Sequence, residues 1–294
     1  MNNMKVFKGH SFAEVYASSL NDLMKYPQYS VSPRGMAIKE FQPCTLVVED
    51  PTLCLYDNLR RSSQYKYIAA ELIWYFMGRK DVEFIEKYAS FWGVIANEDE
   101  TVNSAYGNLL FNEKNEYGLS QWQWAFQTLK TDKDSRQAIM LFNKPHYQWI
   151  GNKDVICTLN AIFNIRDNKL NFSVSMRSND AILGTPTDVA FFCLLQQQML
   201  KLLKPYYPGL ELGTYTHTAN SYHIYERHFT LVDEMIENDF SEKAFPDISW
   251  NFINEHGDPT EDLQKLMMEV ESNKVGDYSE DPLYNWIAEK CTDI

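Results

Sequence analysis

A cysteine and an arginine stand at the two ends of a segment that is typical of a β-hairpin, residues 157–177. Apolar and polar residues alternate on both sides of Asp167-Asn168, as expected of two half-buried strands, and these two residues tolerate a tight turn. Two strands joined by so short a turn run back alongside each other. We therefore expect Cys157 and Arg177 to lie side by side.

This pairing could carry two kinds of chemistry. A thiol beside a guanidinium is biased toward the thiolate, which is the nucleophilic form. The Arg177 guanidinium, followed by Ser178, is also suited to bind a phosphate. The opposing interpretation is that Cys157 is a small buried apolar residue of a strand, which is the commoner role of a single cysteine.

A lone acid stands in the apolar segment 68–77, at Glu71. A charge in such a helix must find a partner or shift its pKa, so Glu71 is a candidate general base. An ion pair with Arg60, Arg61 or Arg79 explains it equally well.

Further candidates also have plain structural explanations. His223 and Tyr225 alternate, so they project to one side and either hydrogen-bond a sugar or cap a strand. His223 and His228 have no third ligand nearby, and we predict no metal site. Asp188 follows Gly184 in Gly-Thr-Pro-Thr-Asp, a sequence that opens a helix, where backbone N–H groups favour anions. Its alternative role is that of a first-turn acid that interacts with the helix dipole.

The composition is typical of a compact, reduced protein. Of the 294 residues, 45% are hydrophobic, and the chain has only 12 glycines and 11 prolines. The five cysteines include no Cys-x-x-Cys pair, which argues against a disulfide framework and a zinc site. The sequence has neither a membrane-spanning apolar run nor the apolar core of a signal peptide near its start. We expect a cytoplasmic protein, in the host cytoplasm if the source is viral.

The formal net charge of −13 disfavours binding along a nucleic-acid polymer, which needs a basic face. It does not exclude a small anionic ligand, because a few clustered arginines can set the local potential. Much of the acidity follows residue 232, where we expect a solvated surface.

Strand-like and helical patterns alternate along the chain, without repeats or long linkers. They predict one α/β (α+β) domain over residues 1–294, a mixed sheet packed with helices, with a turn-rich acidic segment at about 246–294. Helices are predicted at Phe12–Tyr26, Tyr65–Met77, Val82–Phe91, Ser120–Lys130, Thr187–Leu203 and Tyr222–Ile236, with a short one near Glu261–Glu271. Strands are predicted at Ile38–Val48, Gln137–Phe142, Val155–Ile165, Leu170–Met176 and Leu210–Thr218.

Taken together, the motifs resemble one family. From about residue 12 to residue 237, their order is similar to that of thymidylate synthase and its relatives, the pyrimidine nucleotide hydroxymethylases. The motifs are Arg34-Gly, Ala70-Glu-Leu-Ile-Trp-Tyr-Phe-Met-Gly78, Trp92, Tyr106-Gly, Asp134-Ser-Arg136, Cys157, Arg177-Ser-Asn-Asp180, Leu183-Gly-x-Pro-x-Asp188 and His223-x-Tyr225.

The resemblance implies a fold and a reaction. It implies the thymidylate synthase fold, with an obligate homodimer formed through the sheet. Cys157 would add to C6 of a pyrimidine nucleotide, so that C5 can attack the methylene carried by the co-substrate 5,10-methylenetetrahydrofolate. Glu71, through water, would assist proton transfers, and so would Tyr106.

The resemblance also implies binding roles. The 5′-phosphate would contact Arg34, Arg177 and Ser178, and Arg136 would reach the neighbouring subunit's site. The sugar would contact His223 and Tyr225, and Asn179 would be among the nucleotide-binding residues. Trp92, Asp180 and Gly184, together with Glu71, would lie around the folate or the ring.

Three departures from the synthases refine this expectation. The synthases carry asparagine where this chain has Asp188, and a carboxylate accepts from the 4-amino group of cytosine but opposes the O4 of uracil. Asp154 replaces a leucine that helps to exclude water, and with Thr158 it resembles the phage deoxycytidylate hydroxymethylases. Gln137 stands where many relatives have a second arginine, which weakens the phosphate grip.

The expected activity is therefore deoxycytidylate 5-hydroxymethylation, with a use in phage DNA modification as a family-level expectation. Within the family, the alternatives are a thymidylate synthase, a deoxyuridylate hydroxymethylase, a deoxycytidylate methyltransferase and a ribo-CMP hydroxymethylase. From a different class, the alternative is a non-catalytic relative that binds nucleotide, folate or its own messenger RNA. Intact Cys157, Glu71 and Arg177 argue against loss of catalysis.

Overall fold

The computed structural model describes residues 4–247, 249–273 and 280–292. The chain forms two compact units, each assembled from separate segments. The first unit takes Met1–Gln64, Cys157–Gln197 and Glu211–Phe245, and the second takes Tyr65–Ile156, Gln198–Leu210 and Pro246–Ile294. The single catalytic domain over residues 1–294 stays a prediction.

The first unit holds most of the strands. Its strands are β1 (Lys5–Gly9), β2 (Tyr29–Val31), β3 (Ile38–Phe41), β4 (Cys44–Val48), β5 (Leu55–Asn58), β7 (Thr158–Arg166), β8 (Lys169–Met176), β9 (Asn179–Asp180), β10 (Glu211–Ala219), β11 (Tyr222–Tyr225) and β12 (Phe240–Lys243). Its helices are α1 (Phe12–Lys25), α6 (Phe229–Ile236) and most of α5 (Thr185–Leu203), whose last turns belong to the second unit.

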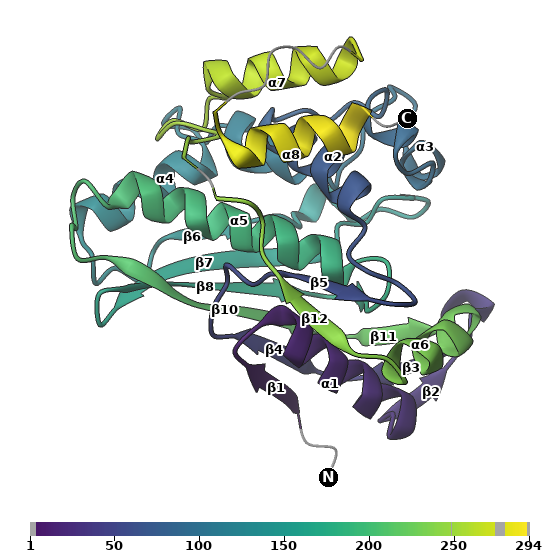
Figure 1. Cartoon of the computed structure of the whole chain (residues 1–294). Coiled ribbons are helices and arrows are strands. Elements are labelled where there is room, and N and C mark those ends of the chain that lie inside the picture. The colour runs from purple at the N-terminus through teal and green to yellow at the C-terminus, as the bar shows by residue number, and fades with distance from the viewer. Residues whose placement is uncertain (1–3, 248, 274–279, 293–294) are drawn as a thin grey trace. The chain divides into compact units, whose positions relative to one another are not determined.

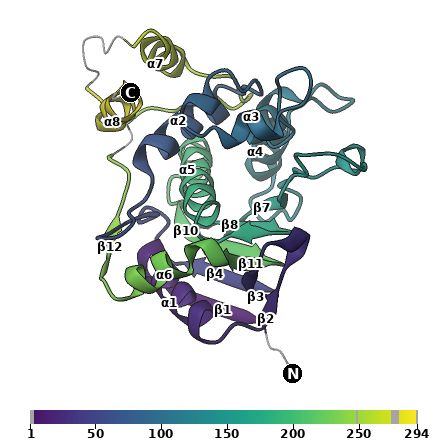
Figure 2. The same cartoon turned by 90° about the vertical axis from the view of Figure 1, so that its right-hand side faces the viewer.

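The main sheet of this unit is mixed, with the strand order β1-β4-β10-β8-β7. β10 pairs parallel with β8 and antiparallel with β4, while β7 and β8 form an antiparallel hairpin. Helix α5 lies along the strands β8 and β10 (Figure 1, Figure 2), and its residues 189–195 are all buried. The mixed sheet packed with helices confirms the predicted fold class.

The hairpin turn has the predicted place. Asp167 and Asn168 both adopt left-handed backbone angles, with φ of 50° and 56°. Two consecutive residues with positive φ make the kind of turn whose twist matches the strands of a hairpin. The turn thus fixes the register in which Phe163 faces Phe172 and Thr158 faces Met176.

A smaller sheet corrects one predicted helix. Residues Tyr222–Ile236 form strand β11 first and helix α6 only from Phe229. β11 pairs with β3 on one side and β9 on the other, in the order β2-β3-β11-β9. A strand buried on both faces has no alternating pattern, so Tyr222, His223 and Ile224 could be taken for a helix. The predicted strand Ile38–Val48 is likewise divided, into β3 and β4.

The second unit is mainly helical. It contains α2 (Tyr65–Phe76), α3 (Phe91–Ile95), α4 (Gln121–Thr131), α7 (Glu261–Glu271) and α8 (Pro282–Thr292), with the short strand β6 (Ile139–Leu141). Helix α2 is the centre of this unit, because every residue from Ile68 to Phe76 is buried. Helices α7 and α8 pack on each other and both contact α2. Figure 1 shows α7 and α8 side by side.

Two predictions in this unit have different outcomes. The short helix at Glu261–Glu271 is confirmed as α7. The predicted helix Val82–Phe91 is wrong, because this stretch holds only a 3₁₀ turn at Ile85–Lys87 before α3. Its apolar residues Val82, Phe84 and Ile85 are buried. Their spacing therefore reflects burial of an irregular segment and not the apolar face of a helix. Among the described residues, no helix combines the length and apolar character needed to cross a membrane.

Candidate active site

Cys157 and Arg177 lie side by side at the open end of the β7–β8 hairpin, which confirms the predicted proximity. The Arg177 backbone N–H donates to the Cys157 carbonyl at 2.8 Å, and its Nη2 lies 3.5 Å from the Cys157 Sγ. The thiol is half-buried and the guanidinium side chain is exposed. A positive charge at this distance favours the thiolate. An irregularity in the pairing of β7 lies at Leu159, two residues after the cysteine.

Asp188 lies in the first turn of α5 and is held from one side. The Asn179 amide Nδ2 donates to Asp188 Oδ2 at 2.8 Å. Gly184 makes this contact possible, because a Cβ at that position would lie 2.9 Å from the same Nδ2. Asp188 is half-buried, and burial raises its pKa to about 7 against the opposing effect of the Asn179 hydrogen bond.

Tyr215 and His217, which were not predicted as site residues, extend the hydrogen bonding between Asn179 and Asp188. The Tyr215 hydroxyl lies 2.8 Å from His217 Nδ1, and His217 Nε2 lies 3.0 Å from Asn179 Oδ1. Burial lowers the pKa of His217 to about 4, so the imidazole is neutral near pH 7. Tyr215, His217, Asn179 and Asp188 thus form a continuous chain of hydrogen bonds, which we call the Asp188 chain.

The other predicted residues of the first unit surround β9. The Asp180 Oδ1 accepts from the backbone N–H groups of Ile182 and Leu183 at 2.8 and 3.1 Å, so this acid shapes the turn before α5. The rings of His223 and Tyr225 meet edge to face, with centroids 5.0 Å apart.

Arg34 lies elsewhere in the first unit, in an exposed 3₁₀ turn. Its φ is +52°, in the left-handed region that residues other than glycine seldom adopt. Ser178 directly follows the exposed Arg177 and is half-buried. These positions leave the Arg34 side chain and the Arg177 guanidinium accessible to an anion.

In the second unit, Glu71 receives a hydrogen bond from within its own helix. The Tyr67 hydroxyl donates to Glu71 Oε1 at 2.5 Å, and the Trp92 indole N–H donates to the Tyr67 oxygen at 3.0 Å. Two of the three arginines that the sequence left open as partners are paired elsewhere, because Arg60 pairs with Glu234 and Arg79 pairs with Asp81 and Glu271. Two predicted site residues, Trp92 and Glu71, are therefore linked by Tyr67, which the prediction did not include.

Tyr106 is fixed by aromatic contacts in the same unit. Its ring stacks on Tyr75 of α2, with centroids 5.2 Å apart and an interplanar angle of 12°, and meets Phe142 edge to face. Gly107 allows this approach, since a Cβ there would lie 1.6 Å from the Tyr75 carbonyl oxygen. The Tyr-Gly pair of the sequence motif is thus one packing unit against α2.

Asp154 has a clear structural role in the second unit. Its buried carboxylate accepts from the Ser104 backbone N–H at 2.7 Å and from the Ser104 hydroxyl. The Asn103 amide donates to the Asp154 carbonyl at 3.0 Å. Asp154 therefore anchors the segment that leads into Tyr106. Arg136 and Gln137, by contrast, are exposed in the loop between α4 and β6.

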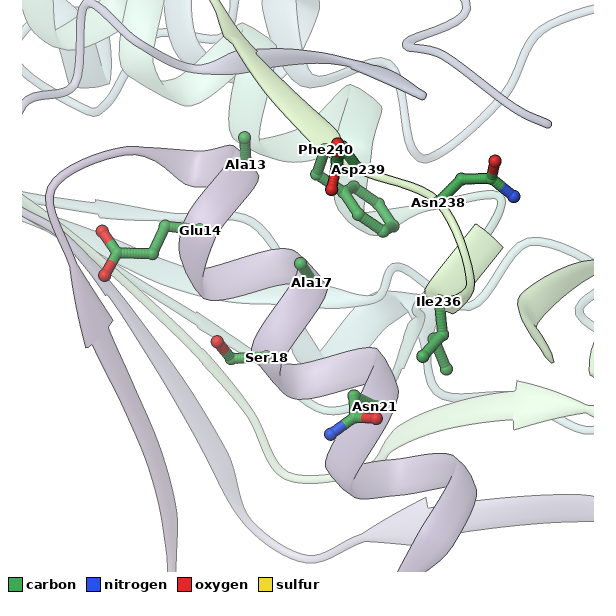
Figure 3. A pocket seen from close by; sticks show the side chains of 9 residues that line it. All are labelled: Ala13, Glu14, Ala17, Ser18, Asn21, Ile236, Asn238, Asp239 and Phe240. Carbon is green, nitrogen blue, oxygen red and sulfur yellow. The ribbon is translucent and has the colours of Figure 1, made fainter. Parts of the chain in front are cut away.

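A surface pocket in the first unit lies apart from these residues. It encloses about 360 Å³ between α1 and the segment after α6, and its lining includes Ala13, Ala17, Ile236 and Phe240 (Figure 3). None of the predicted site residues lines it.

A family model described as thymidylate synthase matches residues 58–286. The chain belongs to the thymidylate synthase family. Its structure is similar to that of the thermostable thymidylate synthase A from Bacillus subtilis, with a TM-score of 0.65 over 83% of this chain and 89% of that one. Because the two sequences are 21% identical, this likeness bears on the fold of the thymidylate synthase family and not on substrate.

Similar proteins include phage enzymes of two substrate classes. The chain is 29% identical over 237 residues to the deoxyuridylate hydroxymethyltransferase of Bacillus phage SP01, covering 76% of this chain and 59% of that relative. It is 30% identical over 223 residues to the deoxycytidylate 5-hydroxymethyltransferase of Enterobacteria phage T4, covering 71% and 85% respectively. As a member of the thymidylate synthase family, the chain is a one-carbon transferase.

The raised pKa of Asp188 predicts how stability changes with pH. The pKa of an aspartate in an unfolded chain is about 3.9. From about pH 4 to 7, the folded state therefore binds a proton at Asp188 more tightly than the unfolded state does. The contribution of Asp188 to stability therefore falls as the pH rises through this window. Compared with Asp188→Asn, the wild type should lose at least about 1 kcal/mol of unfolding free energy between pH 5 and 8, allowing for partial exposure.

Urea unfolding of both proteins at the two pH values measures this difference. Asp167→Asn, which makes the same carboxylate-to-amide change in the exposed hairpin turn, is the matched control. An Asp188→Asn difference that is the same at both pH values would show that burial does not shift this carboxyl.

Proposed function

We propose that the chain is a deoxycytidylate 5-hydroxymethyltransferase, which converts dCMP to 5-hydroxymethyl-dCMP. The single observation that carries the choice of base is the carboxylate of Asp188 at the start of α5, held by Asn179 through one of its two oxygens. The similarity to the deoxycytidylate 5-hydroxymethyltransferase of phage T4 supports the proposal.

The reaction begins at Cys157. Its thiolate, beside Arg177, adds to C6 of the pyrimidine and converts C5 into a nucleophilic enamine carbon. 5,10-Methylenetetrahydrofolate supplies the one-carbon unit to which C5 bonds. C5 then loses its proton, tetrahydrofolate leaves, and an exocyclic methylene remains. Water adds its oxygen to this methylene and releases a proton, and the C6–S bond breaks to return the Cys157 thiolate.

The residues assigned to the folate are compatible with an aromatic co-substrate. In the first unit, Leu183 stands between Asp180 and Gly184 and is 47% exposed. In the second unit, Phe91 and Val94 flank Trp92 in α3 and are 61% and 68% exposed. Large apolar side chains that face solvent beside the assigned residues can be covered by a flat ring system.

Proton transfer is assigned to Glu71, a buried acid of the second unit. Glu71 accepts from Tyr67, which in turn accepts from Trp92, so the carboxylate is held in one rotamer. A fixed carboxylate can move a proton through water at the ring, with Tyr106 as a second group for the proton at C5. The 5′-phosphate is assigned to Arg34, Arg177 and Ser178, and the sugar to His223 and Tyr225.

The proposal includes a homodimer in which Arg136 reaches the partner's phosphate. Two features of the described residues support it. Arg136 is exposed in a loop, with its side chain available to a second copy. Strand β7 also presents an exposed apolar residue, Leu159, on the hairpin that holds Cys157.

A second candidate substrate is dUMP. The similarity to the deoxyuridylate hydroxymethyltransferase of phage SP01 favours it, at nearly the same identity as the phage T4 relative. The same catalytic residues would serve both bases. The choice between the two therefore depends on the residue that faces the exocyclic group at C4, and here that residue is proposed to be Asp188.

Cys157→Ser should abolish release of tritium from C5-labelled nucleotide while nucleotide binding remains, because a serine hydroxyl is far less ionised at neutral pH. Cys193→Ala is the matched control. Cys193 is fully buried in α5, and burial raises the pKa of its thiol far above the usual value, so its loss should leave turnover in place. Substantial tritium release by the Cys157→Ser protein would remove Cys157 from the mechanism.

At pH 8, where Asp188 with its pKa of about 7 is mostly ionised, the wild type should prefer dCMP over dUMP in kcat/KM by at least about tenfold. Opposing the uracil O4 with a carboxylate costs on the order of 1–3 kcal/mol, and about 1.4 kcal/mol corresponds to one decade. Asp188→Asn should shift the preference toward dUMP, because an amide can donate to O4. Products of dCMP, dUMP and CMP with methylenetetrahydrofolate are identified by mass; a wild type that prefers dUMP contradicts the proposal.

Asp154→Leu should lower the hydroxymethyl yield, because an apolar side chain cannot position water, and methylated product or a stalled intermediate should then accumulate. Since Asp154 also anchors Ser104, the matched control is Ser104→Ala, which removes only the hydroxyl hydrogen bond. If both variants change the product ratio equally, the anchoring of the segment before Tyr106 explains the effect. If neither changes it, Asp154 has no part in product choice.

A further inference from the structure

We infer that His217 is a positioning residue, which selects the hydrogen-bonding edge that residue 188 presents to the base by holding the Asn179 amide in one orientation. The inference rests on the proposed function, because it concerns how that function's base is read. It goes beyond Asp188 itself, since it assigns part of the base choice to two buried residues: Asn179, one hydrogen bond from Asp188, and His217, two hydrogen bonds from it.

The Asp188 chain has a direction. A neutral imidazole carries one N–H donor and one acceptor nitrogen. When Nδ1 of His217 accepts from the Tyr215 hydroxyl at 2.8 Å, Nε2–H donates to Asn179 Oδ1 at 3.0 Å. The amide oxygen of Asn179 then faces the imidazole, and its NH₂ group faces Asp188 Oδ2. Each member donates to the next, and the last acceptor is the carboxylate.

The Asn179 amide has little freedom to turn over. Asn179 is 3% exposed and His217 is 1% exposed, so an unsatisfied polar atom in either would be costly. The Thr185 hydroxyl also donates to Asn179 Oδ1, at 2.5 Å. Gly184 lies against the amide nitrogen so closely that a Cβ would fall 2.9 Å from it. Packing and hydrogen bonding therefore define both ends of the amide.

Thr185 cannot fix the orientation of the amide by itself, because a hydroxyl both donates and accepts. Its oxygen lies 3.2 Å from the Asp180 carbonyl, so it could donate there and accept from a reversed Asn179 amide. An imidazole whose Nδ1 accepts from Tyr215 has only a donor at Nε2. A tyrosine hydroxyl can accept as well as donate, so we take Tyr215 as the donor to Nδ1. With that donor, His217 is the member that distinguishes the two orientations when residue 188 is an amide.

This orientation determines what residue 188 shows to the base. Asp188 Oδ2 is engaged by Asn179, and in the described part of the chain Oδ1 receives no hydrogen bond. Oδ1 is then the acceptor for the 4-amino group of cytosine. An asparagine at 188 would turn its oxygen to the Asn179 NH₂ and its own NH₂ to the base, as uracil O4 requires. If residue 179 were an acceptor instead, the same asparagine would turn its oxygen to the base.

A reversed pair tests this directly. The double variant Asn179→Asp with Asp188→Asn keeps the number of atoms and charges but exchanges donor and acceptor. The carboxylate at 179 accepts from His217, Thr185 and the new amide, whose oxygen then faces the base. The ratio of kcat/KM for dCMP to that for dUMP should fall by at least about tenfold in Asp188→Asn and recover by at least about tenfold in the double variant.

The control is Asn179→Ala with Asp188→Asn, which removes the amide without supplying an acceptor and should not restore the preference for dCMP. The inference is supported if the preference for dCMP recovers in Asn179→Asp with Asp188→Asn but not in Asn179→Ala with Asp188→Asn. A wild type without preference for dCMP refutes the proposed function itself. A dCMP-preferring wild type whose Asp188→Asn form prefers dUMP, with no recovery in the double variant, refutes only the inference.

A second pair of variants covers the case in which the double variant does not fold. In the Asp188→Asn background, His217→Phe removes the N–H that fixes Asn179, and the preference for dUMP should fall by at least about tenfold. His217→Gln restores a donor at a similar position and should keep that preference. Equal base ratios in the Phe and Gln forms would overturn the role of His217, whereas a loss of stability alone would not change the ratio.

Discussion

The arrangement of the first unit depends on the backbone register of the β7–β8 hairpin. Two left-handed residues, Asp167 and Asn168, set that register at the closed end. The open end is joined by the Arg177 N–H to the Cys157 carbonyl at 2.8 Å. A shift of one residue would move every side chain of the hairpin to the opposite face. The same shift would separate the guanidinium from the thiol and displace β9, which follows β8 directly and carries Asn179.

Both units hold polar groups in buried positions by the same means. Asn179, Glu71 and Asp154 are each less than 7% exposed, and each receives hydrogen bonds from side chains or backbone of its own unit. Buried polar groups that are satisfied in this way have one defined orientation. Rigid orientation is what a site needs if it is to distinguish an amino group from a carbonyl oxygen on a ring.

Much of the first unit could be predicted from sequence, because its signals are local. The hairpin alternates over nearly twenty residues, and the Asp167-Asn168 turn has a residue-level cause. The proximity of Cys157 and Arg177 follows from those two facts alone. The identity of the family could be predicted because several chemical residue types recur in order, which the match over residues 58–286 confirms.

The remainder depends on contacts between distant residues. His217 meets Asn179 only because β10 pairs parallel with β8, a pairing that alternation in one strand cannot reveal. Tyr67 could have been found, since it stands four residues before Glu71 on one helix face. Helix α8 could also have been predicted, because Asp281 and Pro282 form a typical helix start. In the structure, Asp281 accepts from the backbone N–H groups of Leu283 and Tyr284.

The segment order of the second unit has a consequence during synthesis of the chain. Helix α2 ends at Phe76, yet α8, which packs against it, begins at Pro282, so roughly 200 residues separate them. At about 5–20 residues per second, the ribosome needs about 10–40 s to supply the second helix after the first. Throughout that interval α2, apolar on nearly every side, has only part of its final packing. The apolar surface of α2 is therefore covered completely only late in the synthesis of the chain.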